Sequence, residues 1–205
     1  SFTVPSDTDP PDGDEFQVEG GAAWTNKDVV DVSTNVVGAT EMRFDGGGGW
    51  TEWRDFSADA TVAVPGTGEV TVNAQYRDGG NNVIDLSDTI GIDREPPTVS
   101  CNVRDMEVWD APADLYFVGD DTGGSGVSAV WYVLDGGTPA QAPTTSPLLV
   151  GPGVHTIEWW AVDAAGNVGV HESDTFTVNK TATTLAIKTS ASTVTYPNAA
   201  TITVT

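Results

Sequence analysis

The sequence predicts an all-β protein built from antiparallel β-sandwiches in tandem. One observation is composition, because 23 Gly and 12 Pro among 205 residues favour many short strands joined by turns. Another is that turn residues separate apolar segments every ~8 to 12 residues, as expected of a sandwich, and that no helical period is present. The third is an internal repeat of about 85 residues.

The repeat is clearest where a predicted strand ends. Residues 76–83 align with residues 161–168, so that Asp78 corresponds to Asp163. Further anchors keep the same order at nearly the same offset: Trp24 with Trp109, residues 43–46 with 133–136, and residues 88–90 with 174–176. Such agreement indicates that one structural unit is encoded twice.

Alternating side chains predict the longest strand of each unit. In residues 69–78 the side chains expected to face the core are Val70, Val72, Ala74 and Tyr76. In the counterpart, residues 154–163, Ile157 and Trp159 are expected inside and Trp160 on the opposite face. Asp45-Gly46 and Asp135-Gly136 are expected to supply the positive-φ residues of tight hairpins.

These patterns divide the chain into four segments. Residues 1–16 form an acidic lead, or alternatively include a strand at Ser1–Val4 that belongs to a neighbouring module. Residues 17–94 and 95–180 form the first and second sandwiches, and residues 181–205 begin a third. The border lies within the segment Asp93–Pro97, whose two prolines stiffen the chain and lack the N–H group that a sheet needs.

The strong negative charge excludes several partners. Thirty acidic residues against eight basic ones give a net charge of −22, which repels nucleic acids and anionic lipid surfaces. No apolar run is long enough for membrane insertion of this segment. Either bound divalent cations or salt compensate this charge, or it simply keeps a surface protein soluble. Cys101 has no partner for a disulfide and is expected to behave as a small buried apolar residue.

Acidic residues with glycine-rich neighbours suggest calcium at two places. Asp120 and Asp121 precede the segment Thr122–Ser125, and a sandwich can bring them to the pole where Asp163 and Asn167 lie. The second place is the border between the units, where Asp93 and Glu95 are positioned to share an ion with a loop of the second unit. The alternative at each place is an Asx turn, in which the aspartate caps its own loop.

The sequence does not suggest an enzyme. His155 and His171 lie within predicted strands or at their edges, and no serine occupies a strained nucleophile turn. The run Gly46–Gly49 lacks the lysine and the helix of a phosphate-binding loop. Seven tryptophans do permit a carbohydrate-binding surface, for which Trp50, Trp53 and Trp160 are the candidates, whereas core positions are expected for the set Trp24, Trp109 and Trp159.

Three segments of the second unit, residues 125–128, 131–137 and 161–167, together resemble bacterial Ig-like domain repeats of secreted and cell-surface proteins, including S-layer-like and adhesin-like proteins. The resemblance implies tandem immunoglobulin-like (fibronectin III-like) antiparallel β-sandwiches on the extracellular side of a cell surface. The first unit lacks the paired aspartates that precede Ser125, so the resemblance supports no matching ligand site there.

We therefore expect a non-catalytic structural or spacer array of a surface protein, surface layer or filament, rigidified by calcium. Its partners would be neighbouring Ig-like modules or copies of itself. The alternative is a carbohydrate-binding or adhesive module attached to a secreted enzyme, with cell-surface glycans as partners.

Overall fold

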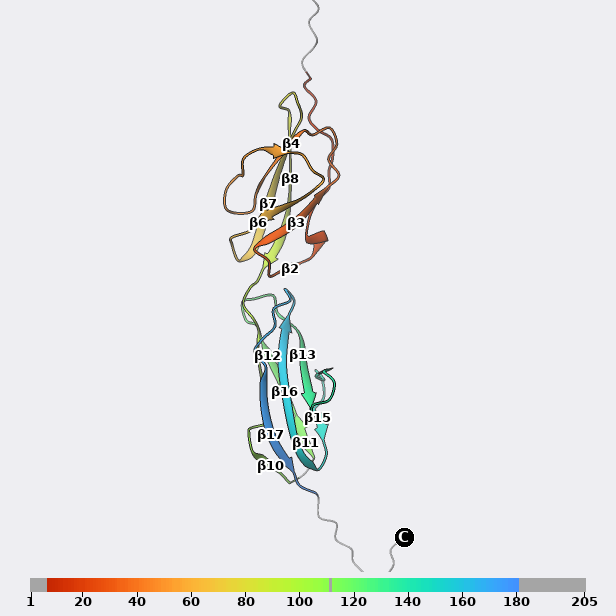
Figure 1. Cartoon of the computed structure of the whole chain (residues 1–205), viewed down its shortest axis with the longest axis vertical. Coiled ribbons are helices and arrows are strands. Elements are labelled where there is room, and N and C mark those ends of the chain that lie inside the picture. Colours follow the sequence, from red (N-terminus) through yellow and green to blue (C-terminus); the bar gives the residue numbers. More distant parts are fainter. Residues whose placement is uncertain (1–6, 111, 181–205) are drawn as a thin grey trace, which may run out of the picture.

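The computed structural model describes residues 7–110 and 112–180, and these residues form two β-sandwiches arranged end to end (Figure 1). The all-β tandem fold predicted from the sequence is confirmed. The expected strand at Ser1–Val4 and the expected third sandwich at residues 181–205 lie outside the described residues. Within the described ranges no helix is long and apolar enough to cross a bilayer, since the one helical element is the three-residue 3₁₀ turn η1 (Glu19–Gly21).

The first sandwich is built from two sheets that pack face to face. One sheet has three strands in the order β1 (Phe16–Val18), β3 (Val29–Thr34) and β6 (Asp59–Ala63). The other has five strands in the order β2 (Trp24–Thr25), β8 (Val83–Ile92), β7 (Gly68–Arg77), β4 (Glu41–Asp45) and β5 (Arg54–Asp55).

The second sandwich repeats this strand order. Its five-stranded sheet runs β10 (Glu107–Trp109), β17 (Glu172–Val178), β16 (Gly153–Asp163), β13 (Val127–Leu134) and β14 (Ala140–Gln141). In the other layer β9 (Thr98–Cys101) pairs with β12 (Phe117–Asp120), and β11 (Ala113–Leu115) pairs with β15 (Leu148–Val150). Tyr116 alone separates β11 from β12, so the two act as one interrupted strand between β9 and β15.

Each sandwich has a core of its own. The predicted alternation in β7 is confirmed, because the side chains of Val70, Val72, Ala74 and Tyr76 are all buried. The Tyr76 ring packs edge-on against Phe44 and Phe56. In the second sandwich Ile157 and Trp159 point inward and Trp160 faces the other way, as expected. The two hydrophobic clusters share no residue.

Two details differ from the sequence-based expectation. The sheets are not wholly antiparallel, because β2 runs parallel to β8 and β10 runs parallel to β17. Positive φ angles occur at Asp135 (53°) and Gly136 (68°), but the expectation for Asp45-Gly46 was wrong. There the Asp45 carboxylate accepts hydrogen bonds from the N–H groups of Gly47 and Gly49, and these glycines carry the positive φ angles instead.

Two single residues also differ in part from expectation. Trp24 was expected in the core, but its indole is only half-buried and lies against Gly91, outside the first hydrophobic cluster. Cys101 packs against the second cluster without being fully buried, and burial raises the pKa of its thiol.

Candidate metal centre at the joint

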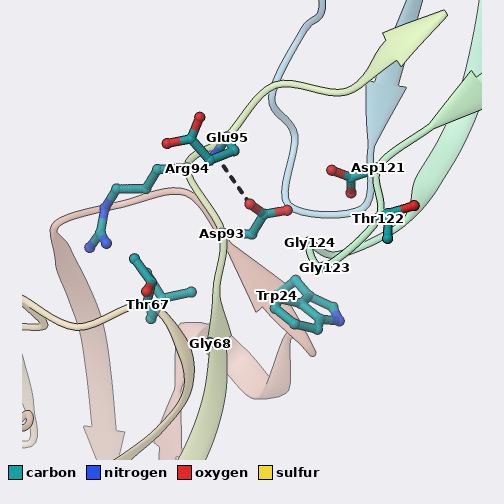
Figure 2. Close-up of a pocket in the computed structure, with 11 residues that line it drawn as sticks. Trp24, Thr67, Gly68, Asp93, Arg94, Glu95, Asp121, Thr122, Gly123 and Gly124 are labelled. Carbon is teal, nitrogen blue, oxygen red and sulfur yellow. Dashed lines mark hydrogen bonds between the residues drawn. The ribbon is translucent and has the colours of Figure 1, made fainter.

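The two sandwiches meet through three chain segments, which we call the joint. They are the linker Asp93–Pro97, the loop Asp121–Gly126 that follows β12, and the turn Asp163–Asn167 that begins at the last residue of β16. The linker continues directly from β8 of the first sandwich, whereas the loop and the turn lie at the facing end of the second sandwich (Figures 1 and 2). The joint is therefore built from both sandwiches.

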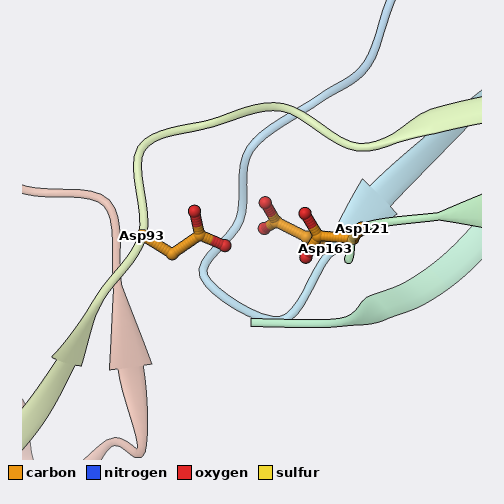
Figure 3. Close-up of side chains that lie close together, drawn as sticks. All are labelled: Asp93, Asp121 and Asp163. Carbon is orange, nitrogen blue, oxygen red and sulfur yellow. The ribbon is translucent and has the colours of Figure 1, made fainter. Parts of the chain in front are cut away.

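Three carboxylates converge in the joint. Asp93, Asp121 and Asp163 each contribute an oxygen, and these three oxygens lie within 4.8 Å of one another. Their side chains point toward a common centre (Figure 3). Asp93 and Asp163 are buried and Asp121 is half-buried. Asp93 was predicted to share an ion with a loop of the second unit, and the loops that lie beside it are those that carry Asp121 and Asp163.

Hydrogen bonds hold Asp93 in its ionised form. Its two carboxylate oxygens accept the backbone N–H groups of Glu95 (3.1 Å) and Ser125 (2.7 Å). Burial by itself raises the pKa of the Asp93 carboxyl, but the hydrogen bonds from Ser125 and Glu95 outweigh this effect and place the pKa below its usual value. The first sandwich thus presents a buried anion to the second.

Asn167 links the sandwiches through its side chain. Its Nδ2 donates to the carbonyl oxygen of Asp93 (3.0 Å) and to Oδ2 of Asp163 (2.7 Å), and it lies 3.5 Å from the carbonyl oxygen of Glu95. Its Oδ1 accepts from Nδ2 of Asn26 in the first sandwich (3.1 Å). A single buried amide therefore contacts the linker, its own turn and the facing sandwich.

The nearest positive side chain in the sequence does not neutralise the three carboxylates. Arg94 follows Asp93, but its guanidinium donates to the carbonyls of Gly66 and Val64 and pairs with Asp28. Figure 2 shows it directed away from Asp93 and Asp121. Buried like charges repel one another strongly unless a cation lies between them, so the arrangement suits a bound positive ion.

The spacing of the three oxygens fits calcium. Calcium binds six to eight oxygens at about 2.3–2.6 Å, so two oxygens on the same ion lie at most about 5 Å apart. The separation of 4.8 Å or less satisfies this limit. Carboxylate oxygens that already accept one hydrogen bond retain a lone pair for a metal. Asp93, Asp121 and Asp163 could therefore hold one calcium ion together with further carbonyl or water oxygens.

The other candidate ligands lie at the edge of this centre. The carboxylate of Asp120 is exposed and caps its own loop by accepting the Thr122 N–H, which is the Asx-turn alternative. The Glu95 carboxylate is exposed and points away from Asp93 (Figure 2), so only its main chain takes part in the joint. Asn167 turns its amide nitrogen, not its oxygen, toward Asp163.

The glycine-rich segment Thr122–Ser125 was part of the predicted site, whereas the position of Trp24 beside it was not predicted. A Cβ atom on Gly124 would lie 2.5 Å from an oxygen of Asp121 and 2.7 Å from one of Asp93, so a side chain there would displace these carboxylates. A pocket of about 430 Å³ beside the carboxylates is lined on one side by Trp24 and on the other by Thr122, Gly123 and Gly124 (Figure 2). The pairing of Trp24 with Trp109 in the repeat was visible in the sequence, but its place at the joint was not.

The tryptophans proposed for sugar binding lie on different sandwiches. Trp50 is 42% exposed, and the Arg43 guanidinium lies over both its ring (4.9 Å) and that of Trp53 (4.6 Å). Arg77 also lies over Trp53, at 4.2 Å. Trp160, on the second sandwich, stacks on His171 with ring centroids 4.2 Å apart. Neighbouring side chains therefore already occupy ring surface on all three indoles.

In the described part of the chain, each histidine side chain lies beside a carboxylate of a neighbouring strand or turn. Nδ1 of His155 lies 2.9 Å from a carboxylate oxygen of Asp135, and Nδ1 of His171 lies 2.5 Å from one of Glu158. Neither contact includes a serine or cysteine nucleophile, and the two histidines bond to different acids. These are contacts of the kind that stabilise a strand surface.

No protein-family model and no curated protein sequence matches this chain. Among solved structures, the fibronectin(III)-like modules of Clostridium thermocellum CbhA are similar, with 14% identity over 80% of this chain and 94% of that chain and a TM-score of 0.50. The chicken CNTN1 FN1-FN3 domains match at 13% identity over 83% of this chain and 69% of that one, with a TM-score of 0.42. At these identities the likeness concerns the fold alone: the chain consists of tandem fibronectin III-like, immunoglobulin-like β-sandwiches.

Proposed function

We propose that this chain is a non-catalytic spacer of an extracellular surface protein, surface layer or filament, and that calcium at the joint holds its two sandwiches in line. The observation that carries the proposal is the position of Asp93. This residue belongs to the end of the first sandwich, yet its carboxylate lies with Asp121 and Asp163 of the second. An ion bound there would tie the sandwiches together and leave the joint less free to bend.

The charge of the whole chain supports the same role. A net charge of −22 favours a surrounding that contains divalent cations or salt, and it disfavours nucleic acid and anionic membranes as partners. The partners that suit an end-to-end arrangement are neighbouring modules or further copies of the chain. Each sandwich has a hydrophobic cluster of its own, and three carboxylates and the Asn167 amide lie where the two sandwiches meet.

A carbohydrate-binding or adhesive module is the second candidate, and the exposed indole of Trp50 is the observation that favours it. A sugar-binding surface usually needs aromatic faces free for stacking. Guanidinium groups lie over the rings of Trp50 and Trp53, and the imidazole of His171 stacks on Trp160. The spacer role is therefore the better supported of the two.

Calcium binding tests the proposal directly. Calorimetric titration of the full chain with CaCl₂ is expected to show one site, and the melting temperature is expected to rise with calcium and fall with chelator. A ligand at 100 times its dissociation constant stabilises the state that binds it by about 2.7 kcal/mol. The variant Asp121→Asn removes one ligand at a half-buried position and is expected to weaken binding at least about tenfold, which is about 1.4 kcal/mol.

The neighbouring residue provides the matched control. Asp120→Asn changes the same chemical group one position earlier, outside the carboxylate cluster, and is expected to leave calcium affinity unchanged. Absence of heat at millimolar calcium, together with a melting temperature that ignores chelator, would refute the calcium site. Equal loss of binding in both variants would refute the assignment of Asp121.

A further inference from the structure

A short segment before the first sandwich repeats the linker of the joint. Residues 7–11 read Asp-Thr-Asp-Pro-Pro and residues 93–97 read Asp-Arg-Glu-Pro-Pro, so each has an aspartate, a second acid two residues later and then two prolines. In both segments the first proline is exposed and the second is buried. The segments are 86 positions apart, close to the offset of the repeat.

The hydrogen bonds within these two segments also match. The carboxylate oxygen Oδ1 of Asp7 accepts the N–H of Asp9 (3.2 Å), as Oδ1 of Asp93 accepts the N–H of Glu95 (3.1 Å). The first residues of the segment 7–11 thus have the same local conformation as the first residues of the linker Asp93–Pro97.

The turn that receives each segment is the same. Asp78–Asn82 directly follows β7, and Asp163–Asn167 begins at the last residue of β16. In each turn the asparagine Nδ2 donates to the aspartate Oδ2, at 2.9 Å for Asn82 and 2.7 Å for Asn167. In each turn the asparagine N–H also donates to the aspartate Oδ1, at 2.9 Å and 2.8 Å respectively.

Both turns hold the linker by the same contact. Nδ2 of Asn167 donates to the carbonyl oxygen of Asp93 at 3.0 Å, and Nδ2 of Asn82 donates to the carbonyl oxygen of Asp7 at 3.2 Å. Asp93 is the residue that directly follows the last strand of the first sandwich. Asp7 is therefore held by the first sandwich in the same way as Asp93, the residue after the last strand of the first sandwich, is held by the second.

We propose that the outer end of the first sandwich, formed by the turn Asp78–Asn82 with residues 7–11, is a second joint that seats the end of a preceding β-sandwich of the same class. This inference deepens the proposed spacer role and rests on it. Asn82 binds the incoming linker through the main-chain carbonyl of Asp7. The contact therefore depends on the backbone path of the linker and not on the linker's side chains.

The two joints differ in one ligand position. Asp121 directly follows β12, and the residue that directly follows the corresponding strand β3 is Asn35. The Asn35 side chain is used locally, since its Oδ1 accepts the N–H groups of Asp14 and Glu15. Among the described residues no group of three metal-ligating side chains forms at the turn Asp78–Asn82. The second joint is therefore expected to stiffen without calcium.

A chain extended by one sandwich tests this inference. A copy of residues 12–92 is placed directly before Asp7, so that Ile92 of the copy precedes Asp7 as it precedes Asp93 in the native chain. In a Cys101→Ala background, spin labels at Thr71→Cys in the two first sandwiches report on the new joint, and labels at Thr71→Cys and Ser173→Cys report on the native one. Pulsed electron resonance then gives the distance distribution across each joint.

We expect a narrow distribution across the new joint, with and without calcium. Asn82→Ala in the original first sandwich is expected to remove the narrow peak across the new joint only, and Asn167→Ala to remove it across the native joint only. A short Gly-Ser insertion between Ile92 of the copy and Asp7 alters neither sandwich and is expected to broaden the new joint as well, which keeps the test valid if Asn82→Ala does not fold.

The possible failures are distinguishable. A broad distribution across the new joint beside a narrow native joint would overturn the second joint and leave the proposed function standing. A new joint that stays narrow after both Asn82→Ala and the insertion would also overturn it. A broad native joint in the presence of calcium would overturn the proposed spacer role itself.

Discussion

The turns after β7 and β16 are each organised by one aspartate and one asparagine. In the first, the Asp78 carboxylate accepts hydrogen bonds from the side chain of Asn82 and from the N–H groups of Asn82 and Gly80. The side-chain hydrogen bond from Asn82 is the main reason that the pKa of the Asp78 carboxyl lies below its usual value, and it outweighs the effect of burial. The stability that this turn contributes therefore depends on pH.

The direction of the pH effect follows from the lowered pKa of Asp78. An unfolded aspartate has a pKa of about 4, so above that pH both states are ionised and the native turn contributes its full stabilisation. As the pH falls through the lower native pKa, the contribution is lost. Asn82→Ala is expected to move the Asp78 pKa up toward its ordinary value, as measured by a carboxyl-carbon NMR titration, and to reduce the loss of first-sandwich stability in acid.

A strand asparagine provides the control for this titration. Asn73 lies within β7 of the same sandwich. Among the described residues its side chain forms no hydrogen bond. Asn73→Ala is expected to leave the Asp78 titration unchanged. An Asp78 pKa that is the same in the wild type and in Asn82→Ala would contradict the role assigned to the asparagine.

At the level of elements, the hairpin that starts at the end of β13 depends on backbone conformation. Asp135 and Gly136 both have positive φ, and the Asp135 carboxylate accepts the N–H of Thr156 at 3.0 Å on the neighbouring strand β16. A Cβ atom added to Gly136 would meet nothing within 4 Å, so any cost of a side chain there comes from φ and not from packing. A substitution at Gly136 therefore tests the effect of the positive φ angle without a steric clash.

We expect Gly136→Ala to lower the stability of the second sandwich by roughly 1–2 kcal/mol, the cost of the left-handed conformation for a residue with a Cβ atom. Thermal unfolding of the second sandwich measures this loss. Gly151→Ala is the matched control, because Gly151 also has open space around it but no positive φ. Equal melting temperatures for Gly136→Ala and the wild type would show that the turn relaxes at no cost.

At the scale of the whole molecule, two apolar cores are connected by a polar joint. Phe44 belongs to the first hydrophobic cluster and Phe176 to the second, and each is 1% exposed. Hydrogen bonds and carboxylates make up the joint, as in the contacts of Asn167 and Asp93. The apolar burial that supplies most of the folding free energy is therefore divided between two separate clusters, one in each sandwich.

Separate cores predict separate responses to core mutations. Phe44→Ala is expected to destabilise the first sandwich by about 3–5 kcal/mol and Phe176→Ala the second by a similar amount. Amide hydrogen exchange resolved along the chain measures both, and protection is expected to fall only in the sandwich that carries the substitution. Loss of protection throughout the chain from either variant would mean that the two sandwiches unfold as one unit.

Much of the fold was predictable because its signals are local. Alternation places Val70, Val72, Ala74 and Tyr76 on one face of a strand whatever the rest of the chain does, since side chains in a strand alternate between two faces. The repeat of Asp78 at Asp163 was also readable, because the same turn chemistry was used twice. The hairpin at Asp45-Gly46 was not predictable, because the Asp45 carboxylate draws the turn onto later glycines.

By itself the sequence determined the all-β class, the repeated unit, the inward faces of the long strands and the acidic residues available for a metal. Only the tertiary structure decided that Asp93 joins Asp121 and Asp163, that Asp120 and Glu95 stay outside, and that Arg43 lies over Trp50 and Trp53. Strand and turn signals depend on contacts between near neighbours in the chain. Which loops meet depends instead on how the two sheets pack and on how the linker Asp93–Pro97, with its two prolines, orients the second sandwich.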